Sequence, residues 1–155
     1  MQLAKYTGAY VVGTTHRESK LGLLKDCDEA VLDDGYLAGK MAPFDKVLDL
    51  IGCKSLRDTM RLGKENGIVC STGVLGGVYA LQWFNPIQDN PNGLYLTSFH
   101  SNDPDRESMQ GIMRFFKESG FHPGIGAVYS FDSVRDAIMA QDHGTANGKI
   151  VVLMQ

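Results

Sequence analysis

Short apolar runs of strand length alternate along the chain with segments of helical periodicity. The runs are rich in Val, Ile, Leu and aromatic residues and are bounded by Gly, Asp, Asn or Pro, which is typical of strands in a sheet. They cover residues 9–14, 29–32, 46–51, 68–71 and 94–99. This alternation predicts an α/β fold with a mainly parallel sheet.

Apolar residues at helical spacing predict a helix over 17–25 and another over 55–62, in which Leu56 and Met60 lie four residues apart. The clearest helix follows Asp103, which can cap it, with Pro104 at the first helical position and Gly120 just past the end. Its apolar stripe is expected to face the core and consists of Met109, Ile112, Met113 and Phe116.

After this helix the pattern restarts as strand, helix, strand. The strands cover 125–130 and 149–154, and Asp132 is the expected cap of the helix between them. The face of that helix expected to point inward carries Val134, Ala137 and Ile138. The chain also contains one long loop, 73–93, and loops of that length tend to be functional or to cover another part of the protein.

Ligands bind beyond the carboxyl ends of the strands in an open parallel sheet, which directs attention to 14–20, 50–53 and 72–77. At the first of these, a site that selects NAD would need Asp or Glu to bind the ribose hydroxyls, but Thr14 and Thr15 stand there. Hydroxyls, with the guanidinium of Arg17 and the ammonium of Lys20, suit a 2′-phosphate. The alternative is an ordinary solvated helix start with surface charges. The Glu18 carboxylate could partly neutralise Arg17 or could point away along the helix.

Composition narrows the class of protein. A hydrophobic content of 43%, a charged content of 21% and a net charge of -3 suit a globular protein that binds neither nucleic acid nor membrane. The three widely spaced cysteines, Cys27, Cys53 and Cys70, suit a reducing compartment and are expected to be buried. Because the N-terminal residues also lack the pattern of a secretory signal, we expect a cytoplasmic protein.

Candidate catalytic chemistry is sparse. The four histidines, His16, His100, His122 and His143, lack the spacing of a metal site, and no motif brings together Ser, His and an acid. The sequence therefore names no catalytic residue and no metal ligand.

Four runs in order resemble the medium-chain dehydrogenase/reductase superfamily, in particular its quinone-oxidoreductase-like members related to zinc-type alcohol dehydrogenases. The runs are VVGTTHRESKLGLLK, FDKVLDLIG, LRDTMRLGKENGIVCSTG, and VYSFDSVRDAI followed by NGKIVVLM. The resemblance implies a Rossmann-like dinucleotide-binding part over 1–120 and a segment over 121–155 that packs on a catalytic domain. It also implies NADP(H), hydride transfer to a carbonyl, enone or quinone substrate, and a homo-oligomer.

The resemblance assigns cofactor roles by position. It places Thr14, Thr15, Arg17 and Lys20 at the 2′-phosphate, with Tyr36 on the adenine side. It places Leu50, Ile51 and Gly52 beside the ribose, and Thr72, Gly73 and Val74 beside the nicotinamide. Gly52 and Gly73 are equally well explained as turn glycines.

Two parts of the family pattern are not matched. They are the preceding catalytic domain and the first Rossmann strand with its glycine-rich turn, which holds the pyrophosphate at a helix N-terminus. That strand would lie at the centre of the sheet, between the strands ending at Thr14 and Ile51. We therefore expect the chain to be inactive alone. Without this strand the sheet must close the gap, pair with another chain or expose unpaired edges.

Two other classes of protein compete with this interpretation. One is a non-catalytic, self-associating Rossmann-like module that uses the apolar strand at 94–99. The other is a methyltransferase-like variant, which is disfavoured because its ribose site also needs an acidic residue and 14–17 supplies none.

Overall fold

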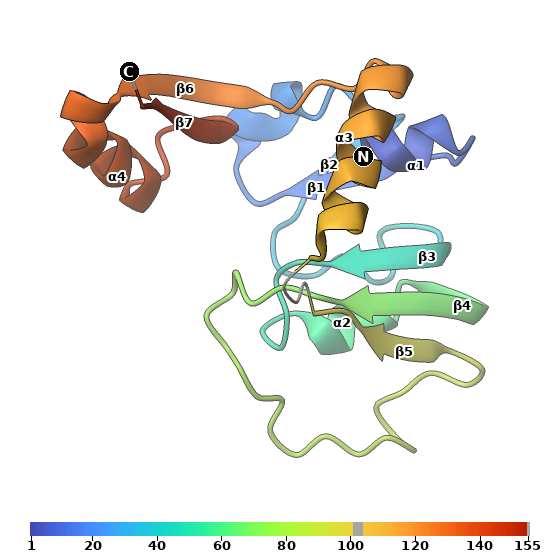
Figure 1. The fold of residues 1–155 in the computed structure, drawn as a ribbon. Helices are drawn as coiled ribbons and strands as arrows, with labels where there is room; N and C mark the ends of the chain where they lie inside the picture. The colour runs from blue at the N-terminus through green and yellow to red at the C-terminus, as the bar shows by residue number, and fades with distance from the viewer. Residues whose placement is uncertain (101–103, 155) are drawn as a thin grey trace. The chain divides into compact units, whose positions relative to one another are not determined.

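The computed structural model describes residues 1–100 and 104–154, which form two compact units (Figure 1). One unit comprises Met1 and Ala9–Asp103, and the other comprises Gln2–Gly8 and Pro104–Gln155. Every pair of hydrogen-bonded strands in the described residues is parallel. The α/β class with a parallel sheet is confirmed.

The first unit opens with a two-stranded sheet. Strand β1 (Val12–Thr15) pairs with β2 (Glu29–Leu32), and a 3-10 helix, η1 (Glu18–Leu23), connects them. The helix predicted over 17–25 is therefore present, but as a shorter 3-10 helix. Gly22 lies inside this connection and disfavours an α-helix, and 3-10 turns are common in short pieces.

The same unit contains a three-stranded parallel sheet in the order β3-β4-β5. Its strands are β3 (Phe44–Asp49), β4 (Gly63–Ser71) and β5 (Tyr95–Ser98), and the helix α2 (Leu56–Met60) connects the first two. Figure 1 shows the three strands side by side. Within residues 1–100 and 104–154 no ladder joins β1 to β3, where the sequence predicted a gap.

Two small clusters of buried side chains form the core of this unit. Leu56 and Met60 of α2 pack with Val69 and Leu94, which confirms their predicted position on one buried face. A second cluster contains Leu37, Ala38 and Leu62. The three cysteines are only partly buried, so their expected burial is overstated.

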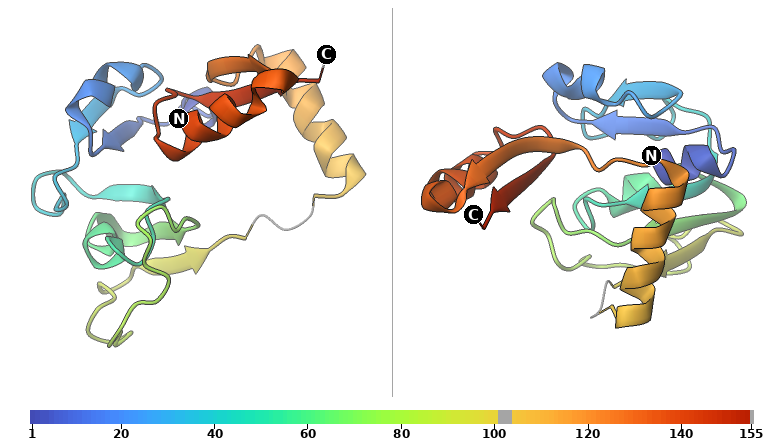
Figure 2. Two further views of the ribbon diagram at one scale, coloured as in Figure 1. Left: turned by 90° about the vertical axis from the view of Figure 1, so that its left-hand side faces the viewer. Right: turned by 45° about the horizontal axis from the view of Figure 1, so that its top comes forward.

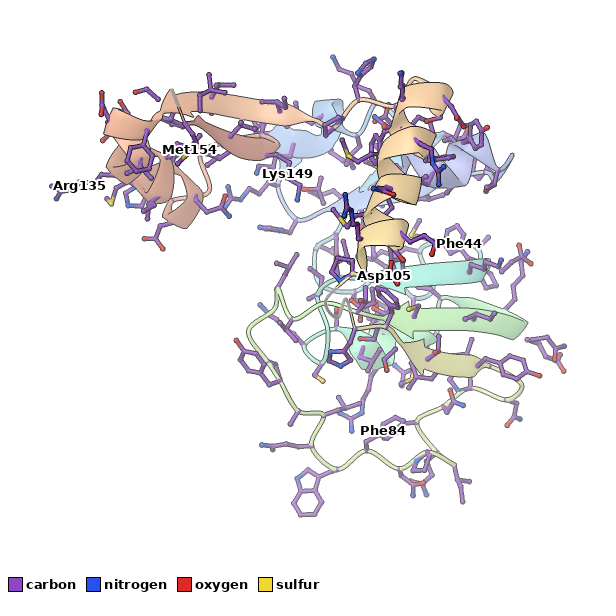
Figure 3. All side chains as sticks on the ribbon, viewed as in Figure 1. Phe44, Phe84, Asp105, Arg135, Lys149 and Met154 are labelled. Carbon is purple, nitrogen blue, oxygen red and sulfur yellow. The ribbon has the colours of Figure 1, made fainter. Side chains whose placement is uncertain are left out.

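The long loop after β4 is fixed to the core at several points. Leu81 and Phe84, the latter labelled in Figure 3, pack against the cluster around Met60. The guanidinium of Arg57 donates to the Gln82 carbonyl at 2.7 Å. Asp89 accepts from the Asn85 amide and pairs with Arg57, and these two contacts, in that order, lower the pKa of Asp89. These contacts define the path of the loop.

The second unit contains another strand-helix-strand segment. Strand β6 (Ile125–Ser130) pairs with β7 (Lys149–Leu153), and η2 (Phe131–Ser133) and α4 (Val134–Asp142) connect them (Figure 2). The same unit holds α1 (Gln2–Tyr6) and α3 (Arg106–Ser119). The sequence assigned α1 and α3 to a nucleotide-binding part over 1–120, and that functional division remains a prediction.

A capping residue defines each end of helix α3. Asp103 lies outside the described residues, and the cap is Asp105, whose Oδ1 accepts from the Ser108 amide at 2.6 Å (Figure 3). This bond keeps the pKa of Asp105 below its ordinary value. Gly120, at φ 69°, ends the helix as predicted.

The apolar stripe of α3 is not buried as predicted. Met109, Ile112 and Met113 are 45%, 47% and 66% exposed, while Phe116 is partly buried. The helix instead packs through aromatic rings, with centroids of Phe115 and Tyr6 5.6 Å apart and of Phe115 and Phe121 5.4 Å apart. The face with the methionines is left to solvent within this unit.

Helix α4 also differs from its prediction at two points. Asp132 lies inside η2, and the cap position is Ser133, which makes no capping hydrogen bond. Of the three residues expected to face inward, Ala137 is buried, Val134 is 37% exposed and Ile138 is 63% exposed. Among the described helices, none has the length and apolar character needed to cross a membrane.

We expect Met60→Ala to destabilise the first unit by about 2 to 5 kcal/mol, because it leaves a cavity in a fully buried position. Urea unfolding measures this change. Ile87→Ala, at a position that is 88% exposed, is the control and should change the unfolding free energy by less than about 0.5 kcal/mol. Equal effects of the two substitutions would contradict the assigned core.

Asp58 of α2 supports the segment that follows β2. Its carboxylate accepts from the Leu37 amide at 2.7 Å and from the Ala38 amide at 3.2 Å. We expect Asp58→Ala to cost about 1 to 3 kcal/mol and to speed hydrogen exchange at these two amides, which lose their acceptor. In Asp45→Ala, which removes an exposed carboxylate paired with Lys64, both amides should keep their wild-type exchange rates.

Candidate functional site

The segments that follow β3 and β4 cross each other through their backbones. The Thr72 amide donates to the Asp49 carbonyl at 2.9 Å, and the Leu75 amide donates to the Leu50 carbonyl at 3.2 Å. The Gly76 amide donates to the Ile51 carbonyl at 2.9 Å. The structure therefore brings together two of the three segments that the sequence singled out, 50–53 and 72–77.

This crossing leaves no room for a side chain at two positions. A Cβ atom on Gly52 would overlap the carbonyl oxygen of Gly73, and one on Gly73 would overlap the backbone of Leu50. Gly52 also has a φ of +82°, a conformation that favours glycine. Both residues are thus required as turn glycines, whatever they bind.

A buried carboxylate shapes the first of the two turns. Asp49, the last residue of β3, is only 4% exposed, and its Oδ1 accepts from the amides of Ile51 at 2.8 Å and Gly52 at 3.0 Å. Sequence reasoning missed this residue. The available signal was an acidic residue at the end of an apolar strand, directly before a glycine-containing turn.

The end of β5 is tied to the same edge of the sheet. The hydroxyl of Thr72 donates to the Phe99 carbonyl at 2.6 Å, so its proton is already used within the chain. Its oxygen can still accept a hydrogen bond from a ligand. Thr72 therefore offers an acceptor at the point where β4 and β5 end together.

The exposed surface of this edge combines apolar side chains with backbone groups. Leu50 and Val74 are 48% and 52% exposed, whereas Gly52 is buried beneath the crossing. Ile51, Thr72 and Gly73 are partly buried. Such a surface fits a flat, uncharged group that makes a few directed hydrogen bonds.

A second group of predicted residues lies where β1 passes into η1. Thr14 and Arg17 are exposed, and Thr15 and Lys20 are partly buried. The Arg17 amide donates to Thr15 Oγ1 at 3.3 Å, and the Lys20 amide donates to the Arg17 carbonyl at 2.9 Å. These bonds place Lys20 one 3-10 turn after Arg17, and in a 3-10 helix residues three apart lie on one side.

The positive charges of this group are not neutralised by a neighbour. Among residues 1–100 and 104–154, neither Arg17 nor Lys20 forms an ion pair, and Glu18 pairs with neither of them. In the described residues, Glu18 therefore does not neutralise Arg17 through direct contact. Two cations at the end of a strand can attract an anionic group.

Tyr36 lies in the segment between β2 and β3 and is 51% exposed. This segment is held by the Asp58 carboxylate and by an ion pair between Asp34 and Lys40, and the Lys40 ammonium lowers the pKa of Asp34. Among the described residues, no hydrogen bond joins Tyr36 to the residues after β1 or to the crossing turns. Its role on the adenine side stays a prediction, as do the cofactor roles of the other ten residues.

The part of the chain that the structure describes contains no group of three or more His, Cys, Asp or Glu side chains able to hold a metal ion. The described residues therefore do not fit a zinc ion.

Comparison with solved structures gives several matches to the whole chain. An NAD-dependent alcohol dehydrogenase is 20% identical with a TM-score of 0.77, over 99% of this chain and 46% of the other. A quinone oxidoreductase from Coxiella burnetii is 19% identical with a TM-score of 0.75, over 99% and 48%. A 2-haloacrylate reductase is 20% identical with a TM-score of 0.76, over 99% and 52%.

These matches are informative about the fold alone, because each identity is below 25%. They confirm the Rossmann-like architecture, and the chain spans about half the length of each of the three solved structures. None of the curated proteins matches the chain. A family model described as a zinc-binding dehydrogenase, however, matches residues 28–152, which is most of the chain.

The family match covers two of the four sequence runs completely and most of a third, and it includes both crossing turns. The chain therefore belongs to the zinc-binding dehydrogenase family, within the medium-chain dehydrogenase/reductase superfamily that its ordered motifs predicted.

Proposed function

We propose that this chain is the cofactor-binding part of an NADP(H)-dependent oxidoreductase. Membership of a dehydrogenase family implies a nicotinamide cofactor. The preference for NADP(H) over NAD(H) rests on one observation, the group Thr14, Thr15, Arg17 and Lys20 where β1 ends. The proposed location of the protein is the cytoplasm.

The end of β1 favours a phosphate over free ribose hydroxyls. A carboxylate there would accept from the 2′- and 3′-hydroxyls and repel a 2′-phosphate, and this chain has two threonines in that position. The guanidinium of Arg17 can form two parallel hydrogen bonds to phosphate oxygens. Lys20, one turn further on, adds a second positive charge that no ion pair uses in the described residues.

The crossing turns suit the other end of the same ligand. A bound nicotinamide cofactor would supply the hydride, which leaves the protein with binding, orientation and exclusion of water. The exposed faces of Leu50 and Val74 provide apolar contact, and the Thr72 oxygen provides an acceptor for an amide group. The backbone crossing would hold these groups in fixed positions relative to one another.

The substrate proposed for the complete enzyme is a small carbonyl, enone or quinone compound. No described residue is assigned to proton transfer, and the chain is proposed to be inactive without further protein that builds the substrate pocket. This proposal agrees with the length of the matched structures, of which the chain covers about half.

Arg17→Ala is expected to weaken NADPH binding by about tenfold or more, because it removes charge-assisted hydrogen bonds to the 2′-phosphate. NADH binding should be unchanged, and Lys20→Ala should have a smaller effect in the same direction. Isothermal titration of the chain with each dinucleotide measures both affinities.

Lys25→Ala is the matched control, since it removes an exposed cation a few residues beyond η1. It should leave the preference for NADPH unchanged. Equal affinity of the wild-type chain for NADPH and NADH would contradict the proposed preference, and binding of neither would contradict the proposed function.

A second proposal, a non-catalytic module that self-associates, is favoured by β5. This strand lies at the edge of its sheet, and all four of its residues are exposed. Tyr95 and the neighbouring Phe99 are each 62% exposed. An edge with this much exposed apolar surface can pair with a second strand.

Light scattering tests self-association directly. A homo-oligomer should form at high concentration, and Leu96→Lys on β5 should shift it toward monomer, because a charge at an edge strand opposes pairing. Ile68→Lys at an exposed position of the neighbouring β4, which is already paired on both sides, is the control for added charge. A wild-type chain that stays monomeric would exclude this second proposal.

A further inference from the structure

Asp49 is the most deeply buried acidic residue that the proposed function leaves unused. It is 4% exposed, and its Oδ2 is buried without a hydrogen-bond partner among the residues that the structure describes. Burying a carboxylate is costly unless its hydrogen bonds repay the cost. The two bonds that Oδ1 accepts therefore indicate a position at which the shape of the turn matters.

The Asp49 carboxylate holds the turn at 50–52 by hydrogen bonds, and the carbonyls of that turn hold the segment at 72–76. Oδ1 accepts from the amides of Ile51 and Gly52, which bends the chain directly after β3. This bend presents the carbonyls of Leu50 and Ile51 as acceptors for the amides of Leu75 and Gly76. The Asp49 carbonyl itself accepts from Thr72.

We infer that Asp49 is a positioning residue for cofactor binding: its side chain holds the turn at 50–52 so that the segment at 72–76 is locked in place across it. The inference rests on the proposed function, because it concerns the ribose and nicotinamide sides of that site. Asp49 acts through the backbone of both turns and does not itself touch the ligand.

Asp49→Ala removes the one oxygen that accepts from both amides of the first turn, whereas Asp49→Asn retains an oxygen that can accept from the same two amides. Asp45→Ala is the matched control, since Asp45 lies four residues earlier on β3 and its side chain is 83% exposed. Hydrogen exchange of individual amides, followed by NMR on the 155-residue chain, reports the state of each turn.

Asp49→Ala should speed exchange at Ile51 and Gly52 and also at Leu75 and Gly76, which the substitution does not contact. Asp49→Asn should retain the wild-type rates at Leu75 and Gly76, and so should Asp45→Ala. Faster exchange confined to Ile51 and Gly52 would overturn the inference, because the second turn would then not depend on Asp49.

Measuring ligand binding distinguishes a positioning role of Asp49 from a general effect of the substitution on stability. In Asp49→Ala, the folded chain should bind NADPH about tenfold more weakly, as expected when binding groups are misplaced, and should bind 2′,5′-ADP as wild type does. The shorter ligand lacks the nicotinamide half and serves as a probe of the segment around Arg17. Asp49→Asn should restore the affinity for NADPH.

The outcomes for the inference and for the proposed function are distinct. Wild-type affinity for NADPH in Asp49→Ala would overturn the role of Asp49 and leave the proposed function standing. An equal loss of affinity for NADPH and 2′,5′-ADP would overturn it too, because it would indicate general destabilisation. A wild-type chain that binds neither ligand would overturn the proposed function and, with it, the binding role of Asp49.

Discussion

The backbone crossing beyond β3 and β4 is the constraint on which the candidate site depends. Two chain segments approach so closely that carbonyl and amide groups of one bond directly to those of the other. This approach is possible only because Gly52 and Gly73 lack side chains. Once the crossing exists, the exposed faces of Leu50 and Val74 and the oxygen of Thr72 occupy fixed positions on one edge of the sheet.

The crossing continues the backbone pairing of the parallel sheet. Strand β4 pairs with β3 on one side and β5 on the other, and Val69 at its centre is completely buried. The Thr72 hydroxyl donates to the carbonyl of Phe99, the residue that follows β5, and so links β5 to this edge. The long loop that follows is held separately, by Phe84 packed against the core cluster and by Arg57.

Membership of a dehydrogenase family and the chemistry of the residues support the proposed function in different ways. The family match covers residues 28–152 and gives the class of protein. The group from Thr14 to Lys20 precedes that range and carries the proposed preference for the phosphorylated cofactor. The proposed preference thus depends on a few polar side chains beside η1, and the proposed binding of a dinucleotide depends on backbone geometry.

The sequence by itself determined the α/β class, the succession of strands along the chain and which segments follow their carboxyl ends. It could do so because strand periodicity and turn residues are local properties. Tertiary structure alone decided that Gly52 and Gly73 meet, since this fact needs residues some twenty positions apart to lie in contact. It also decided that Met109, Ile112 and Met113 face solvent within their unit. Periodicity marks one face of a helix as apolar, but only the packing of neighbouring elements decides whether that face is covered.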